Sequence, residues 1–122
     1  MKKILIVEDD RDLVEILELH LKKYGYEVDH AYDGEKALEK VKEFNPDLII
    51  LDIMLPKLDG HVFNQQIKSD FKTKNIPIIA ISGKIGVKEI LMAENQLTVS
   101  AFFYKPVQTS VLIQEIKKLL RE

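Results

Sequence analysis

Short apolar runs alternate five times along the chain with longer segments whose apolar residues recur at helical spacing. The runs contain few polar residues, as expected for strands that are buried on both faces of a parallel sheet. The longer segments are amphipathic, as helices that cover a sheet would be. The predicted strands are Lys3–Val7, Tyr26–Ala31, Leu48–Leu51, Pro77–Ile81 and Ala101–Tyr104. The predicted helices are Asp10–Tyr24, residues 34–44, residues 61–69, Val87–Asn95 and Thr109–Leu120.

Local signals mark the ends of these elements. Gly25 follows the first predicted helix, where a glycine commonly ends a helix, and Asn45-Pro46 ends the second. The apolar positions expected on the first helix are Leu13, Ile16, Leu17, Leu21 and Tyr24, and those expected to face inward on the third are Val62, Phe63 and Ile67.

The alternation predicts one α/β domain, a three-layer α/β/α sandwich that spans residues 1–122 and has right-handed crossovers. Hydrophobic residues make up 46% of the chain and charged residues 31%, which is typical of a folded domain rather than a disordered one. We find no linker, internal repeat or low-complexity segment.

Charge and composition exclude several classes of function. The net charge is −2, and the 18 basic and 20 acidic residues are spread along the chain. The sequence has no basic patch of the kind that binds nucleic acid, so we expect no direct nucleic-acid partner. The longest apolar stretches, Leu48–Leu51 and Ile76–Ile81, are far shorter than the roughly 20 residues of a membrane span. There is no cysteine for disulfides or thiolate chemistry. We therefore expect a cytoplasmic protein without a membrane partner.

Polar residues follow four of the five predicted strands. The first strand leads into Glu8–Asp10, the third into Asp52, the fourth into Ser82-Gly83 and the fifth into Lys105-Pro106. Ligands of open parallel sheets bind at the carboxyl ends of the strands. We therefore expect these acids, the hydroxyl and the lysine to meet at one edge of the sheet.

Such a group of side chains suits phosphoryl chemistry. Neighbouring carboxylates repel unless a proton or cation lies among them, and an all-oxygen set suits Mg²⁺. Asp52 could attack a phosphoryl group and form an acyl phosphate, while Lys105 and Ser82 would contact the phosphoryl oxygens. Taken singly, the same residues have plain structural explanations: Glu8–Asp10 as caps of the first helix, Asp52 as a turn residue, and Ser82 and Lys105 as ordinary strand-end residues.

Four segments, taken in order, carry a resemblance to a known family. They are Ile4–Asp10, Asp47–Gly60, Pro77–Ser82 and Tyr104–Pro106. Over practically its full length the chain resembles the receiver domains of bacterial response regulators, the CheY-like group. The resemblance implies the flavodoxin-like strand order 2-1-3-4-5 of a five-stranded parallel sheet, for which CheY is a standard example.

The resemblance also implies a role for each site residue. Asp52 corresponds to the phosphoacceptor, and Glu8 and Asp9 to the acids that hold Mg²⁺ (or Mn²⁺) with it; the backbone carbonyl of Met54 is implied as a further ligand. The other implied roles are a switch hydroxyl at Ser82, a phosphate-contacting lysine at Lys105, a cis bond between Lys105 and Pro106, and a switch aromatic at Phe102.

These roles imply a signalling switch rather than a turnover enzyme. A sensor histidine kinase or a phosphotransfer protein would donate the phosphoryl group to Asp52 in a Mg²⁺-dependent step. The face made by the fourth helix, fifth strand and fifth helix would then change and control a downstream protein target. The only catalysis expected is of the protein's own phosphorylation and dephosphorylation. Because Met54 and Lys84 offer no group that positions water, we expect slow dephosphorylation.

Two alternatives remain open. The chain could be a receiver fragment of a larger response regulator without its output domain. It could also be an aspartate-nucleophile phosphohydrolase, but such enzymes use a second acid two residues past the nucleophile, where this chain has Met54.

Four positions depart from receivers of winged-helix transcription factors. Those receivers often pair acids before the switch aromatic with charges on the last helix, and the corresponding residues here are Ser100, Ala101, Val111 and Glu115. The sequence therefore disfavours that dimer and leaves the oligomeric state open.

Overall fold

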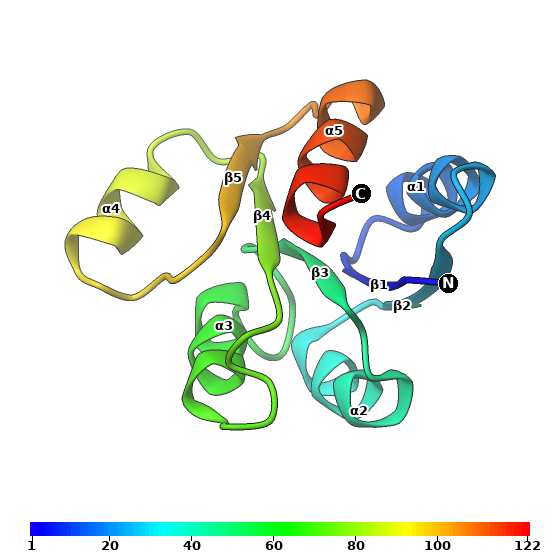
Figure 1. The fold of residues 1–122 in the computed structure, drawn as a ribbon. Coiled ribbons are helices and arrows are strands. Elements are labelled where there is room, and N and C mark those ends of the chain that lie inside the picture. The colour runs from blue at the N-terminus through cyan, green and yellow to red at the C-terminus, as the bar shows by residue number, and fades with distance from the viewer.

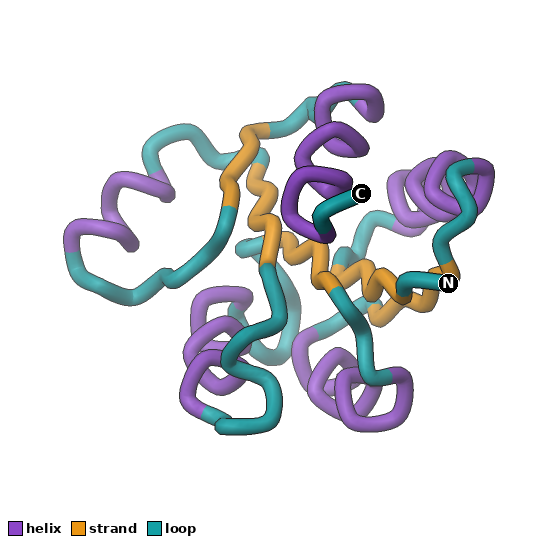
Figure 2. Tube along the Cα trace, viewed as in Figure 1, coloured by secondary structure: helices purple, strands orange, loops and turns teal.

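The computed structural model describes residues 1–122 as one sheet with helices on both faces (Figure 1 and Figure 2). The strands are β1 (Lys3–Val7), β2 (Glu27–Ala31), β3 (Leu48–Asp52), β4 (Ile78–Ser82) and β5 (Ala101–Tyr104). The helices are α1 (Arg11–Lys23), α2 (Gly34–Phe44), α3 (Gly60–Ser69), α4 (Val87–Ala93) and α5 (Thr109–Leu120). None of these helices has both the length and the apolar character that a bilayer span requires.

The sheet has the strand order β2-β1-β3-β4-β5, and every neighbouring pair is parallel. The predicted three-layer sandwich and the order implied by the resemblance are confirmed. In register, Asp52 lies opposite Ile81 and Ser82 lies opposite Tyr104. The carboxyl ends of the central strands therefore reach one edge together.

The core consists of one apolar layer on each face of the sheet. Helices α1 and α5 cover one face, whereas α2, α3 and α4 pack on the other, with α4 beside the outer strand β5 (Figure 1). The central strands β1, β3 and β4 are almost fully buried, but β2 and β5 at the edges are only partly buried. Each fully buried Leu or Ile contributes about 1.5–3 kcal/mol relative to an exposed one, so the central strands are the most firmly held.

Both ends of α1 follow from the local sequence. The Asp10 side chain accepts hydrogen bonds from the backbone N–H groups of Asp12 and Leu13, which caps the helix. At the other end Gly25 has φ +89°, and its N–H donates to the Lys22 carbonyl. That conformation strains any residue with a Cβ, so Gly25 ends the helix as predicted.

Some sequence-based details differ from the structure. The buried face of α1 consists of Val14, Leu17 and Leu21, whereas Ile16 and Tyr24 are 50% and 54% exposed. The apolar stripe of α1 is thus wider than the surface that the sheet and α5 can cover. Helix α4 ends at Ala93, two residues earlier than predicted.

Helix α3 contains a buried polar residue that the pattern did not reveal. Phe63 and Ile67 face the core as predicted, but Val62 is only partly buried, and Asn64 is 1% exposed. The Asn64 amide donates to the Thr98 carbonyl and accepts from the Thr98 N–H, both at 2.8 Å. These bonds satisfy the buried amide and attach the segment before β5 to α3.

Candidate functional site

The expected side chains do meet at the carboxyl edge of the sheet. Glu8 follows β1, Asp52 ends β3, Ser82 ends β4 and Lys105 follows β5. Glu8, Asp52 and Ser82 are almost inaccessible to solvent, with exposures of 0%, 3% and 0%. Buried polar groups are costly unless they have partners, so this cluster needs an explanation beyond turn formation.

Lys105 joins the two buried acids. Its Nζ lies 3.1 Å from Asp52 Oδ2 and 2.7 Å from Glu8 Oε1. The other Asp52 oxygen, Oδ1, accepts a hydrogen bond of 2.9 Å from the Met54 N–H. Both oxygens of Asp52 are therefore held by donors, which fixes the carboxylate at the rim of the sheet.

Glu8, Asp9 and Asp52 form a cluster that suits a hard divalent cation. One carboxylate oxygen from each lies within 4.8 Å of the others. Buried Glu8 Oε1, although close to Lys105 Nζ, accepts no hydrogen bond of suitable angle. Three acids beside one lysine leave an excess of negative charge, and all the ligand atoms are oxygens. The residues thus fit Mg²⁺ or Mn²⁺, which prefer such ligands.

The electrostatics of the site are those of a crowded acidic pocket. Burial raises the pKa of Glu8 to about 7, and the nearby Asp52 carboxylate acts in the same direction against the Lys105 ammonium. Burial disfavours the charge on Lys105, but the contacts with Glu8 and Asp52 outweigh it and raise the pKa of Lys105. The ammonium therefore stays charged at neutral pH and can attract an anionic phosphoryl group.

The contacts of the Ser82 hydroxyl and of the Phe102 ring are with residues other than Glu8, Asp52 and Lys105. The Ser82 hydroxyl accepts a hydrogen bond of 3.1 Å from the Lys84 N–H, in the loop between β4 and α4. The Phe102 ring is partly buried on the face covered by α2, α3 and α4. The Lys105-Pro106 bond is cis, in agreement with the resemblance. Asp9 is exposed, and the Met54 carbonyl as a metal ligand stays a prediction.

The backbone that follows Asp52 is packed closely against Gly60. A Cβ on Gly60 would lie 2.5 Å from Ile53 Cα and 2.6 Å from the Asp52 carbonyl oxygen. The Gly60 N–H also donates to the Ile53 carbonyl at 3.0 Å. The absence of a Cβ on Gly60 therefore lets the start of α3 touch the backbone of Asp52 and Ile53.

Replacing Gly60 with Ala should destabilise the fold by about 3 kcal/mol, because backbone atoms cannot move aside as a side chain can. Urea unfolding measures this change. Gly83→Ala is the matched control, since a Cβ there meets only Lys105 Cδ at 3.9 Å. A Gly60→Ala protein as stable as the wild type would contradict the close packing described here.

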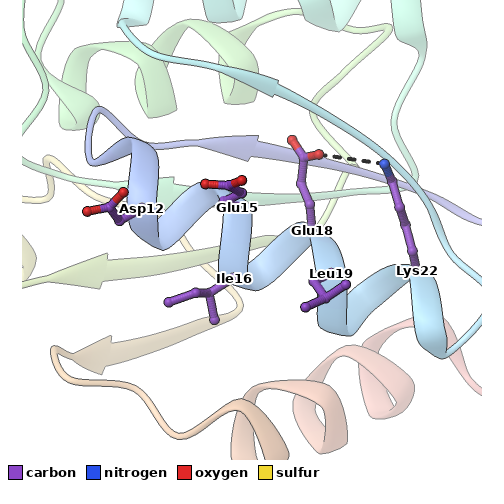
Figure 3. Close-up of a pocket in the computed structure, with 6 residues that line it drawn as sticks. All are labelled: Asp12, Glu15, Ile16, Glu18, Leu19 and Lys22. Atoms are coloured by element: carbon purple, nitrogen blue, oxygen red, sulfur yellow. Dashed lines mark ion pairs between the residues drawn. The ribbon is translucent and has the colours of Figure 1, made fainter.

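Helix α1 presents an exposed surface beside the site. A groove of about 500 Å³ runs from Lys105 and Pro106 to Leu13 and Ile16. It continues along the outer face of α1, where Ile16 and Leu19 project from one side and acids from the other (Figure 3). The acids shown are Asp12, Glu15 and Glu18, of which Glu18 pairs with Lys22 at 3.7 Å.

Comparisons with known proteins identify the family and the fold of this chain. The family model described as the response regulator receiver domain matches residues 4–117. A structure of a putative response regulator from Chloroflexus aurantiacus J-10-fl is 30% identical, has a TM-score of 0.88, and the match covers 99% of this chain and 98% of that one. The signal receiver domain of a signal transduction histidine kinase from Syntrophus aciditrophicus is 29% identical, with a TM-score of 0.90 and coverage of 99% and 91%.

A third similar structure contains a metal. It is the receiver domain of a sensor histidine kinase from Pseudomonas aeruginosa PAO1, with a magnesium ion coordinated in its active-site cleft. It is 26% identical to this chain, has a TM-score of 0.88, and the match covers 99% of this chain and 98% of that one. From the fold, the acidic site and the match over residues 4–117, the chain belongs to the response regulator receiver domain family of two-component systems.

Proposed function

We propose that this receiver domain accepts a phosphoryl group on Asp52 and then changes the surface formed by α4, β5 and α5. The observation that carries the proposal is the pairing of Lys105 with both buried acids, 3.1 Å from Asp52 and 2.7 Å from Glu8. A lysine held this close to a buried carboxylate could neutralise the charge of a phosphoryl group that arrives there.

The transfer would form one bond and break one. A carboxylate oxygen of Asp52 attacks phosphorus, a P–O bond forms, and the P–N bond of the donor's phosphohistidine breaks, with the electron pair leaving on the imidazole. The Met54 N–H holds the other oxygen of Asp52, which aims the carboxylate. Lys105 stays protonated throughout and stabilises the charge on the phosphoryl oxygens.

Glu8, Asp9 and Asp52 are the residues that would hold Mg²⁺. The ion would supply positive charge that offsets both the acids and the phosphoryl oxygens. The similar Pseudomonas domain, which contains coordinated magnesium in its cleft, supports this assignment.

The output would follow from the charge added to the site. A phosphoryl group brings about −1.5 to −2 charges. The Ser82 hydroxyl, at the end of the strand that pairs with that of Asp52, would turn toward it. Ser82 would release the Lys84 N–H, and Phe102 would turn inward. A downstream protein would then recognise the altered face. In this proposal the protein is a switch in the cytoplasm and not a turnover enzyme.

The phosphodonor would dock on α1. The groove that begins at Lys105 and Pro106 leads onto this helix, so a protein bound there could bring a phosphohistidine to Asp52. Ile16 and Leu19 are 50% and 60% exposed and are flanked by acids. A sensor kinase or phosphotransfer protein with an apolar helix edged by basic residues would fit this surface.

Incubation with acetyl phosphate and Mg²⁺ tests the proposal. We expect a stoichiometric mass gain of one phosphoryl group that is lost in base, no gain with Asp52→Asn, and slow loss after removal of the donor. Intact-protein mass spectrometry measures all three. Full labelling of Asp52→Asn would end the assignment. Continuous release of phosphate without a lasting adduct would instead indicate a phosphohydrolase.

A further inference from the structure

We propose that Tyr104 is a latch that holds the loop between β4 and α4 in its unphosphorylated position and thereby limits how readily Asp52 is phosphorylated. Tyr104 would be a positioning residue, because it touches neither Asp52 nor Lys105 Nζ in the contacts described above. The inference rests on the proposed function and adds a residue to which the sequence pattern assigned no role.

The Tyr104 hydroxyl bridges two parts of the α4 region. It accepts a hydrogen bond of 3.2 Å from the Gly86 N–H and donates one of 2.9 Å to Glu89 Oε2. Gly86 is the cap residue of α4, and Glu89 lies in its first turn. One side chain at the end of β5 thus holds both the end of the loop and the start of the helix.

The loop that Tyr104 holds also donates a hydrogen bond to the Ser82 hydroxyl. Its Lys84 N–H donates to the Ser82 hydroxyl at 3.1 Å, and Gly86 lies two residues further along. If Ser82 turns toward a phosphoryl group, the Lys84 N–H loses its partner and the loop has to move. Tyr104 opposes that movement because Gly86 would have to leave the tyrosine hydroxyl.

Tyr104 also contacts the aromatic that is expected to switch. The rings of Phe102 and Tyr104 meet edge to face, with centroids 5.2 Å apart. From the first turn of α4, Lys88 Nζ lies 6.0 Å from the centroid of the Phe102 ring. An inward turn of Phe102 would give up both contacts, so the latch and the aromatic are mechanically linked.

Helix α4 has few other contacts that hold its first turn. It has seven residues, and its cap residue Gly86 has no side chain that could accept a helix N–H. Only Val87 and Leu91 of this helix are buried. Short helices depend on tertiary contacts for their position, so the loss of the Tyr104 bonds should matter here more than in a long helix.

Replacing Tyr104 with Phe removes the hydroxyl and keeps the ring. Since the latch stabilises only the unphosphorylated arrangement, its removal shifts the balance toward the phosphorylated one. Loss of one or two hydrogen bonds predicts about threefold to tenfold tighter binding of beryllofluoride, a phosphoryl mimic, in the presence of Mg²⁺. The rate of labelling by acetyl phosphate should rise by a similar factor. Fluorine NMR titration measures the first value.

Variants at Glu89 separate the latch from a general loosening of the fold. Glu89→Ala removes the bond to Glu89 but leaves the one from Gly86, so it should tighten beryllofluoride binding less than Tyr104→Phe does. The double variant should bind like Tyr104→Phe alone, because that variant already removes both bonds. Glu89→Gln keeps an acceptor for the hydroxyl and should bind like the wild type. Tyr24→Phe, which alters a tyrosine that is 54% exposed just after the end of α1, is the matched control and should leave beryllofluoride binding unchanged.

Two results distinguish failure of the latch from failure of the proposed function. If the wild type binds beryllofluoride but Tyr104→Phe binds it equally or more weakly, the latch is wrong and the switch stands. The same holds if Tyr104→Phe only lowers the free energy of unfolding in urea. If the wild type neither binds beryllofluoride nor is labelled, the proposed function fails and the latch fails with it.

Discussion

Replacing Lys105 with Met should slow the labelling of Asp52 by acetyl phosphate about 10²- to 10³-fold. Its Nζ is the only ammonium in contact with both Asp52 and Glu8. Without it the phosphoryl group must approach two buried carboxylates with no fixed cation from the protein, and loss of one preorganised donor typically costs a factor of this size. Time courses of intact mass at saturating Mg²⁺ measure the rate.

Two variants control for charge and for size at Lys105. Lys36→Met also removes one positive charge, but from an exposed residue of α2 whose side chain pairs only with Glu39, at 3.8 Å. Its rate of labelling should equal that of the wild type. Lys105→Arg keeps the positive charge but replaces the compact ammonium with a guanidinium. Its labelling rate should lie between those of Lys105→Met and the wild type. Labelling of Lys105→Met within threefold of the wild type would show that the lysine does not assist the transfer.

Addition of Mg²⁺ should stabilise the protein by about 2.7 kcal/mol at a concentration one hundred times the dissociation constant. The stabilisation arises because the folded chain places Glu8, Asp9 and Asp52 together, whereas the unfolded chain does not. Asp9→Asn should lose most of this gain and, because Asp9 is exposed, should leave the metal-free fold nearly unchanged. Urea unfolding in EDTA and in Mg²⁺ measures the difference.

The neighbouring acid provides the control for the metal experiment. Asp10 caps α1 and lies outside the three-acid cluster. Asn is an equally good cap, so Asp10→Asn should keep the full response to Mg²⁺. If both variants lost the stabilisation by Mg²⁺ equally, the ion would be attracted only by the overall negative charge of residues 8–10 and not bound by the three-acid cluster.

Much of the fold could be predicted because burial on both faces leaves a clear pattern. The apolar runs of β1, β3 and β4 are central and fully buried, so their sequences contain almost no polar residues before the strand end. The strand order is a different matter. Five parallel strands can be ordered in several ways, and only the resemblance to a known family selected 2-1-3-4-5.

The cluster of Glu8, Asp52 and Lys105 was predictable for a simple geometric reason. Each residue ends or directly follows a strand, and parallel strands bring their carboxyl ends to one edge. Periodicity does not report contacts between side chains from different elements. The Tyr104 hydroxyl and its bonds to α4 were missed for this reason, as was the burial of Asn64 against Thr98.

The most direct test of the account is the identification of the residue that carries the phosphoryl group. Borohydride reduces an acyl phosphate of aspartate to homoserine, which peptide mass spectrometry then locates. After labelling with acetyl phosphate and Mg²⁺, we predict homoserine at position 52 and at no other acid. Homoserine at position 9 or 10, or an unreduced adduct on one of the three histidines, would contradict the account.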